Sequence, residues 1–258
     1  MGSDASKSGA VPDGFVARQA ERVPVNRRRP PGRLAFLVLL GALVAGLLAF
    51  GIGEVAAPLI PSEKLEPKIM GPKSTIASRS TTGVVMRTSA LQSGILGACL
   101  AGCLGTAGGL ARRSALAAML WGTLGLAVGL ALGAGLTIAL FPWYFQAREL
   151  HANQEFISSM ILHGAIWAPL GAVSGLALAF GSGQWRRWGQ LLIAGLLGAL
   201  LGAVACDVIG AILFPLARTA DPVAETWLTF LTSRLLVTLG TALLLVLGLS
   251  PDRRPAGK

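Results

Sequence analysis

Five ionisable side chains fall inside otherwise apolar runs of this sequence, where charged groups are unusual. They are two acids, Glu54 and Asp207, and three candidate bases, Arg87, His163 and Arg234. In a run that crosses a bilayer, such a group costs about 2 to 3 kcal/mol, so it is expected to face protein or water and to find a partner. Acids and bases of this kind can bind an ion or relay a proton, and they can also hold helices together.

Counting along the runs places these groups in one layer. Glu54 lies seven residues and Asp207 eight residues before a proline that ends its run. His163 and Arg234 lie at a similar distance after the start of the next runs, and Arg87 lies nearer the start of its own. At about 1.5 Å per residue, these positions share a depth in one half of the membrane. We therefore predict that the acids pair with Arg234, Arg87 or His163.

Two interpretations of this polar layer stay open. In the first, it is an ion or proton pathway, with Asp207 and Glu54 as carriers and His163 as a titrating gate. In the second, it is a static network that fixes the helices in register, with Arg87 merely at the membrane interface. The inner halves of the runs lack charged residues, which argues against a proton pathway continuous from one side to the other.

Six apolar runs position these residues, and each is long enough to cross a bilayer. Hydrophobic residues make up 53% of the 258 residues and charged residues 13%, against roughly 25% charged in soluble domains. The sequence predicts an all-α polytopic membrane domain over 34–250, between a disordered basic tail (1–33) and a C-terminal tail (251–258). The predicted helices cover about 34–60, 85–110, 115–141, 156–180, 189–214 and 227–249, with polar loops over 61–83 and 143–151.

The runs repeat. At a shift of 73 residues, three glycines and a Leu-Phe-Pro ending coincide between 122–142 and 195–215, and a weaker copy spans 41–61. The other three helices align at a shift of 70 residues, as at Ser89, Ser159 and Thr229. This pattern predicts a two-helix hairpin used three times in one orientation, which is a parallel repeat.

Small residues recur at intervals of four, which puts them on one face of a helix. Gly125, Gly129 and Gly133 form one such stripe, and Gly198, Gly202 and Cys206 form another. In lipid, such faces mark close helix contacts. They favour tight packing within the bundle, and they also suit a second copy or a membrane partner. Pro169, inside the fourth predicted helix, is expected to bend it.

Arginine pairs stand at every second boundary between the runs, at 112–113, 186–187 and 253–254, and arginines also close the basic tail. By the positive-inside rule, both termini are expected in the cytoplasm of a multi-pass protein. With no targeting peptide recognised, a bacterial inner (plasma) membrane is the expected location. The basic tail suits anionic lipid head groups; nucleic acid is not expected, because the charges flank apolar runs.

No catalytic motif stands out, so we do not expect an enzyme. Three cysteines (Cys99, Cys103 and Cys206) do not form a metal-ligand pattern, and no metal or cofactor is expected. The first functional hypothesis is a small transporter or channel with its polar site in the outer half of the bundle. The alternative is a non-catalytic structural or assembly subunit of a membrane complex. A polar layer that opens to solvent in a cavity favours the first, and a small-residue stripe facing lipid favours the second.

Overall fold

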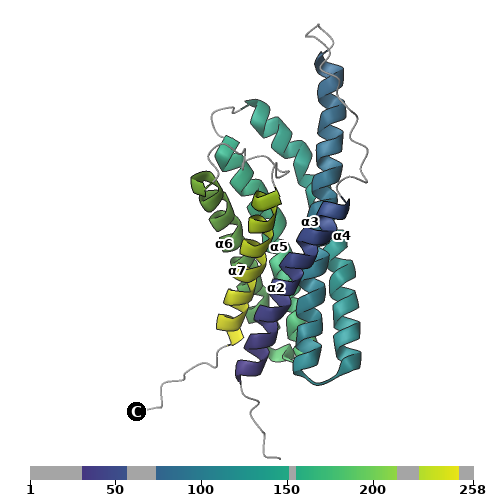
Figure 1. Cartoon of the computed structure of the whole chain (residues 1–258), viewed down its shortest axis with the longest axis vertical. Coiled ribbons are helices and arrows are strands. Elements are labelled where there is room, and N and C mark those ends of the chain that lie inside the picture. The colour runs from purple at the N-terminus through teal and green to yellow at the C-terminus, as the bar shows by residue number, and fades with distance from the viewer. Residues whose placement is uncertain (1–30, 57–73, 151–154, 214–226, 250–258) are drawn as a thin grey trace, which may run out of the picture. The chain divides into compact units, whose positions relative to one another are not determined.

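A computed structural model describes residues 31–56, 74–150, 155–213 and 227–249. These residues form six α-helices and one short 3₁₀ helix (Figure 1). Their bounds are α2 (Pro31–Ala56), α3 (Ser74–Ala111), α4 (Ala115–Leu150), α5 (Glu155–Ser182), η3 (Trp185–Arg187), α6 (Trp188–Leu213) and α7 (Trp227–Leu249). In the described part of the chain, six helices are long and apolar enough to cross a membrane. The prediction of a helical, multi-pass membrane protein is therefore confirmed.

The helices divide into inner and outer sets. Each outer helix packs against two inner ones: α4 against α3 and α5, α6 against α5 and α7, and α2 against α7 and α3. In the apolar window of each span, 67% of α3 and of α5 is buried, compared with 28% for α2 and α4 and 33% for α6. The third inner helix, α7, is 39% buried and hardly contacts α5. The inner set is therefore closely packed between α3 and α5 and looser at α7.

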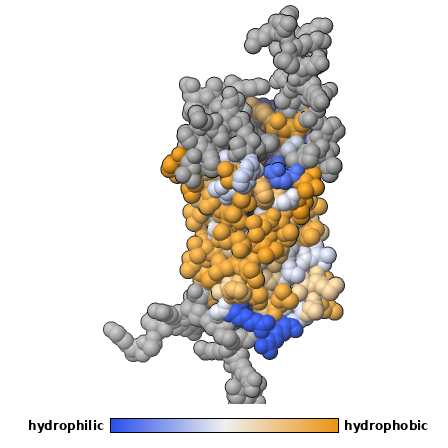
Figure 2. Space-filling view, viewed as in Figure 1, coloured by the Kyte–Doolittle hydropathy of each residue, from blue (hydrophilic) through white to orange (hydrophobic). Residues whose placement is uncertain are grey.

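The outer surface of the bundle is apolar. Figure 2 shows a continuous hydrophobic band across the middle of the visible face, with hydrophilic residues beyond it at either end. Large apolar side chains on this surface are exposed, including Leu120, Leu126, Ile193 and Val208. A bilayer would cover such side chains with acyl chains, and the helices satisfy their own backbone hydrogen bonds.

Backbones touch where glycines face each other across helices. A Cβ atom added to Gly129 of α4 would lie 2.2 Å from the carbonyl oxygen of Gly97 on α3. A Cβ atom on Gly195 of α6 would lie 2.2 Å from the carbonyl oxygen of Gly171 on α5. Side chains larger than hydrogen cannot occupy these positions without moving a helix. Close packing of this kind is the main attraction between helices in lipid.

Helices α3 and α5 end in the same way. Arg113 and Gly183 both have left-handed backbone angles, with φ of 60° and 74°. In each turn, two backbone N–H groups donate back to the last helical turn: Arg113 to Leu110, Ser114 to Gly109, Gly183 to Phe180 and Gln184 to Ala179. This is the Schellman pattern of helix termination. The two turns meet at one end of the bundle, because a Cβ atom on Gly108 would lie 2.8 Å from the nitrogen of Ser182.

Two predicted boundaries were wrong. Helix α3 begins at Ser74 rather than near 85, since the Ser- and Thr-rich segment before Gly83 contains no proline to stop it.

Helix α4 continues through Pro142 to Leu150, where a loop was predicted over 143–151. Phe141, Tyr144 and Phe145 share one helix face and pack together, with ring centroids 5.6 to 6.2 Å apart. This burial outweighs the hydrogen bond that Pro142 removes. The predicted N-terminal tail (1–33) overlaps the start of α2 at 31–33. Its other residues, the C-terminal tail and most of the 61–83 loop lie outside the described residues.

Candidate functional site

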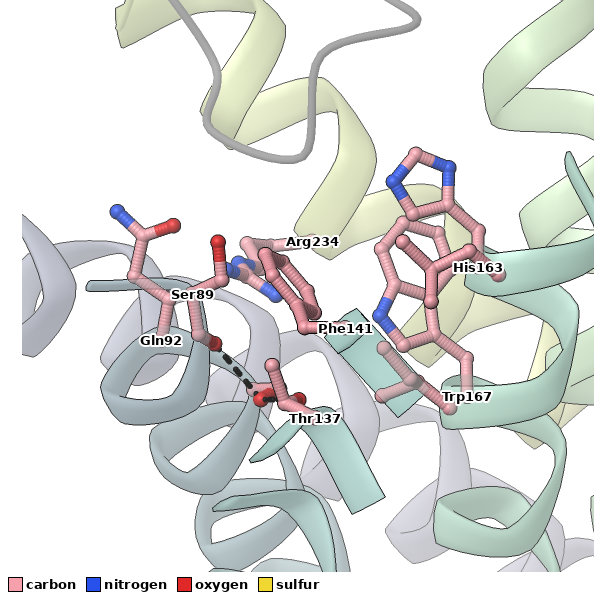
Figure 3. Close-up of a pocket in the computed structure, with 10 residues that line it drawn as sticks. Ser89, Gln92, Thr137, Phe141, His163, Trp167 and Arg234 are labelled. Carbon is pink, nitrogen blue, oxygen red and sulfur yellow. Dashed lines mark hydrogen bonds between the residues drawn. The ribbon is translucent and has the colours of Figure 1, made fainter. Parts of the chain in front are cut away.

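A small polar cavity lies where α3, α4, α5 and α7 meet. Its volume is about 30 Å³, which is room for one or two water molecules. Figure 3 shows the side chains that converge on it. The described residues that line it are Ser89, Gln92 and Ser93 of α3, Thr137 and Phe141 of α4, Leu162, His163, Ile166 and Trp167 of α5, and Arg234 of α7.

The cavity lies away from the end that carries the turns at Arg112–Arg113 and Arg186–Arg187, which we call the arginine turns. Arg187 at that end donates from Nη1 to the carbonyl oxygen of Leu249, the last residue of α7, at 3.4 Å. Arg234 is the eighth residue of α7, and eight residues of helix span about 12 Å. The polar layer is therefore in the half of the bundle where α7 begins.

His163 and Asp207 form a buried pair beside the cavity. His163 Nδ1 lies 3.0 Å from Asp207 Oδ1, and the two side chains are 12% and 4% exposed. Which atom donates in this bond depends on the tautomer of the imidazole. The imidazole stacks on Trp167, with ring centroids 4.8 Å apart and planes 12° apart. These two contacts fix the orientation of His163.

Arg234 is a buried charge that lacks a described acidic partner. Its side chain is 5% exposed, and its Nε atom has no hydrogen-bond partner in the described part of the chain. The guanidinium lies 4.5 Å from the ring centroid of Phe230, and that ring contacts Phe50 of α2. A cation–π contact stabilises one face of the guanidinium. The N–H bonds of the guanidinium lie in its plane and point outward from its edge. Figure 3 shows the Arg234 side chain reaching towards Ser89 and Phe141.

Hydroxyl groups line the α3–α4 side of the cavity. Thr137 Oγ1 donates to the carbonyl oxygen of Gly133 at 2.8 Å and lies 2.5 Å from Ser93 Oγ. Ser93 Oγ also lies within hydrogen-bond distance of the carbonyl oxygens of Ser89 and Gly133. By contrast, the hydroxyl of Ser89 is buried with no partner among the described residues. Ser89 is therefore the hydroxyl that remains free to bind something in the cavity.

The structure brings together three of the five ionisable residues singled out in the sequence. His163 and Arg234 line the cavity, and Asp207 reaches it through His163. Glu54 and Arg87 are exposed, do not line it, and make no ion pair with a described residue. They were included because of their position along the helices, which does not give the direction of a side chain. The buried face of α2 contains Gly53, and the next residue of a helix points about 100° away.

Several cavity residues were not predicted as site residues. Gln92, Thr137 and Trp167 are uncharged, so a search for ionisable groups in apolar runs passes over them. The spacing of Ser89, Gln92 and Ser93 over one turn of α3 is the signal that could have found them. In the described residues, no three His, Cys, Asp or Glu side chains gather as metal ligands would.

The fold and the cavity define the class: a polytopic helical membrane protein with a buried polar layer off the centre of the bundle. No protein-family model, curated protein or solved structure matches this chain.

Proposed function

We propose that this protein is a small transporter or channel that moves an ion through the polar layer. The observation that carries this proposal is Arg234, a charge buried at a cavity without a described acidic partner. Burying such a charge in a membrane domain is costly. Residues kept at a cost to stability are often functional. A purely structural network would be expected to pair Arg234 with a carboxylate.

The arrangement of the helices supports the proposal. We infer that the chain is three tandem hairpin repeats, because the turn residues Arg113 and Gly183 are 70 positions apart and share one backbone geometry. Ser93 and His163, also 70 positions apart, both line the cavity. Transporters built from repeats hold their substrates at the interface between repeats. The loose contact of α7 with α5 supplies a place where such an interface could open.

The alternative function, a structural or assembly subunit, has less support. Its expected sign is a small-residue stripe left on the lipid-facing surface. Gly125, Gly129 and Gly133 of α4 face α3, and a Cβ atom on Gly202 of α6 would lie 2.7 Å from Val237 Cα on α7. These stripes are occupied by contacts inside the bundle, which leaves less reason to expect a partner there. A homo-oligomer through other surfaces is compatible with transport.

We further propose that the arginine turns face the cytoplasm of a bacterial inner membrane. Arg112–Arg113 and Arg186–Arg187 lie in short turns at one end of the bundle, where the positive-inside rule is strongest. On this orientation both termini are cytoplasmic, and the polar layer lies in the outer half of the membrane.

Flux through reconstituted vesicles tests the proposal. Vesicles containing the parent protein, Arg234→Gln or Arg87→Gln are compared with protein-free vesicles for protons, sodium, potassium and chloride. We expect at least one ion to move faster with the parent protein, and Arg234→Gln to lose that flux while Arg87→Gln keeps it. Arg87 is the matched control because it is an exposed arginine outside the cavity. Equal rates in parent and protein-free vesicles would overturn the proposal.

A further inference from the structure

The charge and the hydrogen-bond donors around the cavity point to a class of ion, an inference that rests on the proposed function at this same site. We propose that the cavity binds a small inorganic anion of about halide size, held by Arg234 and by the neutral donors beside it. The described residues that line the cavity carry a net positive charge. An arginine side chain stays protonated in proteins, and none of the described residues lining the cavity is a carboxylate.

Asp207 is the described acid that contacts a residue lining the cavity. Asp207 does not line the cavity, and its Oδ1 atom is held by His163 at 3.0 Å. Its second oxygen, Oδ2, has no partner among the described residues. A cation entering the cavity would meet the guanidinium of Arg234 in its wall, whereas none of the described lining residues is a carboxylate. An anion would be attracted by the positive charge of the same guanidinium.

The neutral groups also favour an anion. Ser89 Oγ has no hydrogen-bond partner in the described part of the chain, and it lines the cavity. Figure 3 shows the indole nitrogen of Trp167 on the side that faces Phe141 across the cavity, and the amide nitrogen of Gln92 pointing away from Arg234. The Ser89 hydroxyl and the Trp167 N–H can donate hydrogen bonds, which anions accept. Charge-assisted hydrogen bonds of this kind are about twice as strong as neutral ones.

The size of the cavity limits the anion. About 30 Å³ accommodates one or two waters, so a monatomic anion fits after losing most of its water shell. The loss of water makes binding depend on the donors in the wall, so removal of one donor should have a measurable effect.

Anion binding is tested on the purified full chain in detergent, with the unfolding temperature and tryptophan fluorescence as readouts. Sodium chloride, bromide or iodide replaces sodium gluconate at constant ionic strength. We expect a saturable rise in unfolding temperature with halide, because a ligand that binds only the folded state stabilises it. Ser89→Ala should weaken the apparent affinity about tenfold, which is the effect of one hydrogen bond to a charged group.

Ser159→Ala is the matched control. Ser159 stands 70 positions after Ser89, and its hydroxyl is also buried without a described partner, but it does not line the cavity. Its replacement should leave the affinity unchanged. Gln92→Glu should abolish halide binding, because it adds a negative charge of nearly the same shape to the wall of the cavity that Arg234 also lines. This variant keeps the test valid if Arg234→Gln fails to fold.

The outcomes separate this inference from the transport proposal. No saturable halide effect, or an equal effect in the parent and in Gln92→Glu, would overturn the anion site. Flux of a cation without halide binding would overturn the anion site and leave transport standing. Halide binding without flux of any ion would leave the anion site standing and overturn transport.

Discussion

His163 Nδ1 and Asp207 Oδ1 lie 3.0 Å apart, although 44 positions separate the residues in the chain. This contact joins α5 to α6 at the depth of the polar layer. Both side chains are mostly buried, and the second carboxylate oxygen of Asp207 has no partner among the described residues. Removing Asp207 would therefore leave the His163 Nδ1 atom without its partner, and removing His163 would leave Asp207 Oδ1 without its partner.

A double-mutant cycle on this pair should show coupling. We expect His163→Ala and Asp207→Leu each to lower the free energy of unfolding in detergent by about 1 to 3 kcal/mol, since each leaves a buried polar group unpaired. The double variant should lose less than the sum of the two, by about 0.5 to 3 kcal/mol. Asp207→Asn, which keeps an acceptor for His163, should lose least. Additive losses would contradict the contact.

The glycine contacts predict a sharp difference within α4. Gly129→Ala should destabilise the protein by about 1 to 3 kcal/mol, because its Cβ atom would overlap the backbone of Gly97 on α3. Gly135→Ala is the control, since no atom lies within 4 Å of its added Cβ. In that open position, alanine should be neutral or stabilise the helix by up to about 1 kcal/mol. Similar unfolding temperatures for the two variants would contradict the close packing of α3 and α4.

The two arginine turns predict opposite effects of glycine and alanine. Arg113 has a φ of 60°, a conformation that costs a residue with a side chain about 1 to 2 kcal/mol. Arg113→Gly should therefore raise the free energy of unfolding by roughly 1 kcal/mol. Gly183→Ala, in the equivalent turn with a φ of 74°, should lower it by a similar amount. Thermal unfolding of the purified proteins measures both, and the same sign for both variants would refute the shared turn geometry.

The two unpartnered serine hydroxyls should contribute nothing to folding. Ser89 and Ser159 are buried, and neither hydroxyl has a partner among the described residues. Replacement by alanine removes a buried donor without leaving a described partner unsatisfied. The free energy of unfolding of the anion-free protein should therefore be unchanged or higher by up to about 1 kcal/mol. A loss above about 1 kcal/mol in either variant, measured in gluconate buffer, would show that the hydroxyl is bonded.

Much of the fold follows from hydropathy alone. All six spans are apolar runs of sufficient length, and lipid allows such runs only helical structure. The position at which α4 ends could not be predicted from hydropathy. Pro142 predicts a stop, whereas the burial of Phe141 and Tyr144 keeps the helix intact. Local rules describe the cost of a proline, but the compensating contact depends on tertiary packing.

The site was predictable in depth but not in direction. Counting residues placed His163, Asp207 and Arg234 in one layer, and the structure brings them to one side of the bundle. The same counting included Glu54 and Arg87, which are exposed. Depth depends only on position along a helix, while the direction of a side chain depends on how each helix is rotated. The single sequence does not determine that rotation.

The most direct test of transport through the polar layer is the sign of the diffusion potential across vesicles that contain the protein. A potassium chloride gradient is imposed, and a voltage-sensitive dye reports the potential. For the parent protein and for Arg87→Gln, we predict a diffusion potential with the sign expected when chloride crosses the membrane and potassium does not. For Gln92→Glu, we predict no diffusion potential. The opposite sign, or no potential with the parent protein, would contradict anion transport at Arg234.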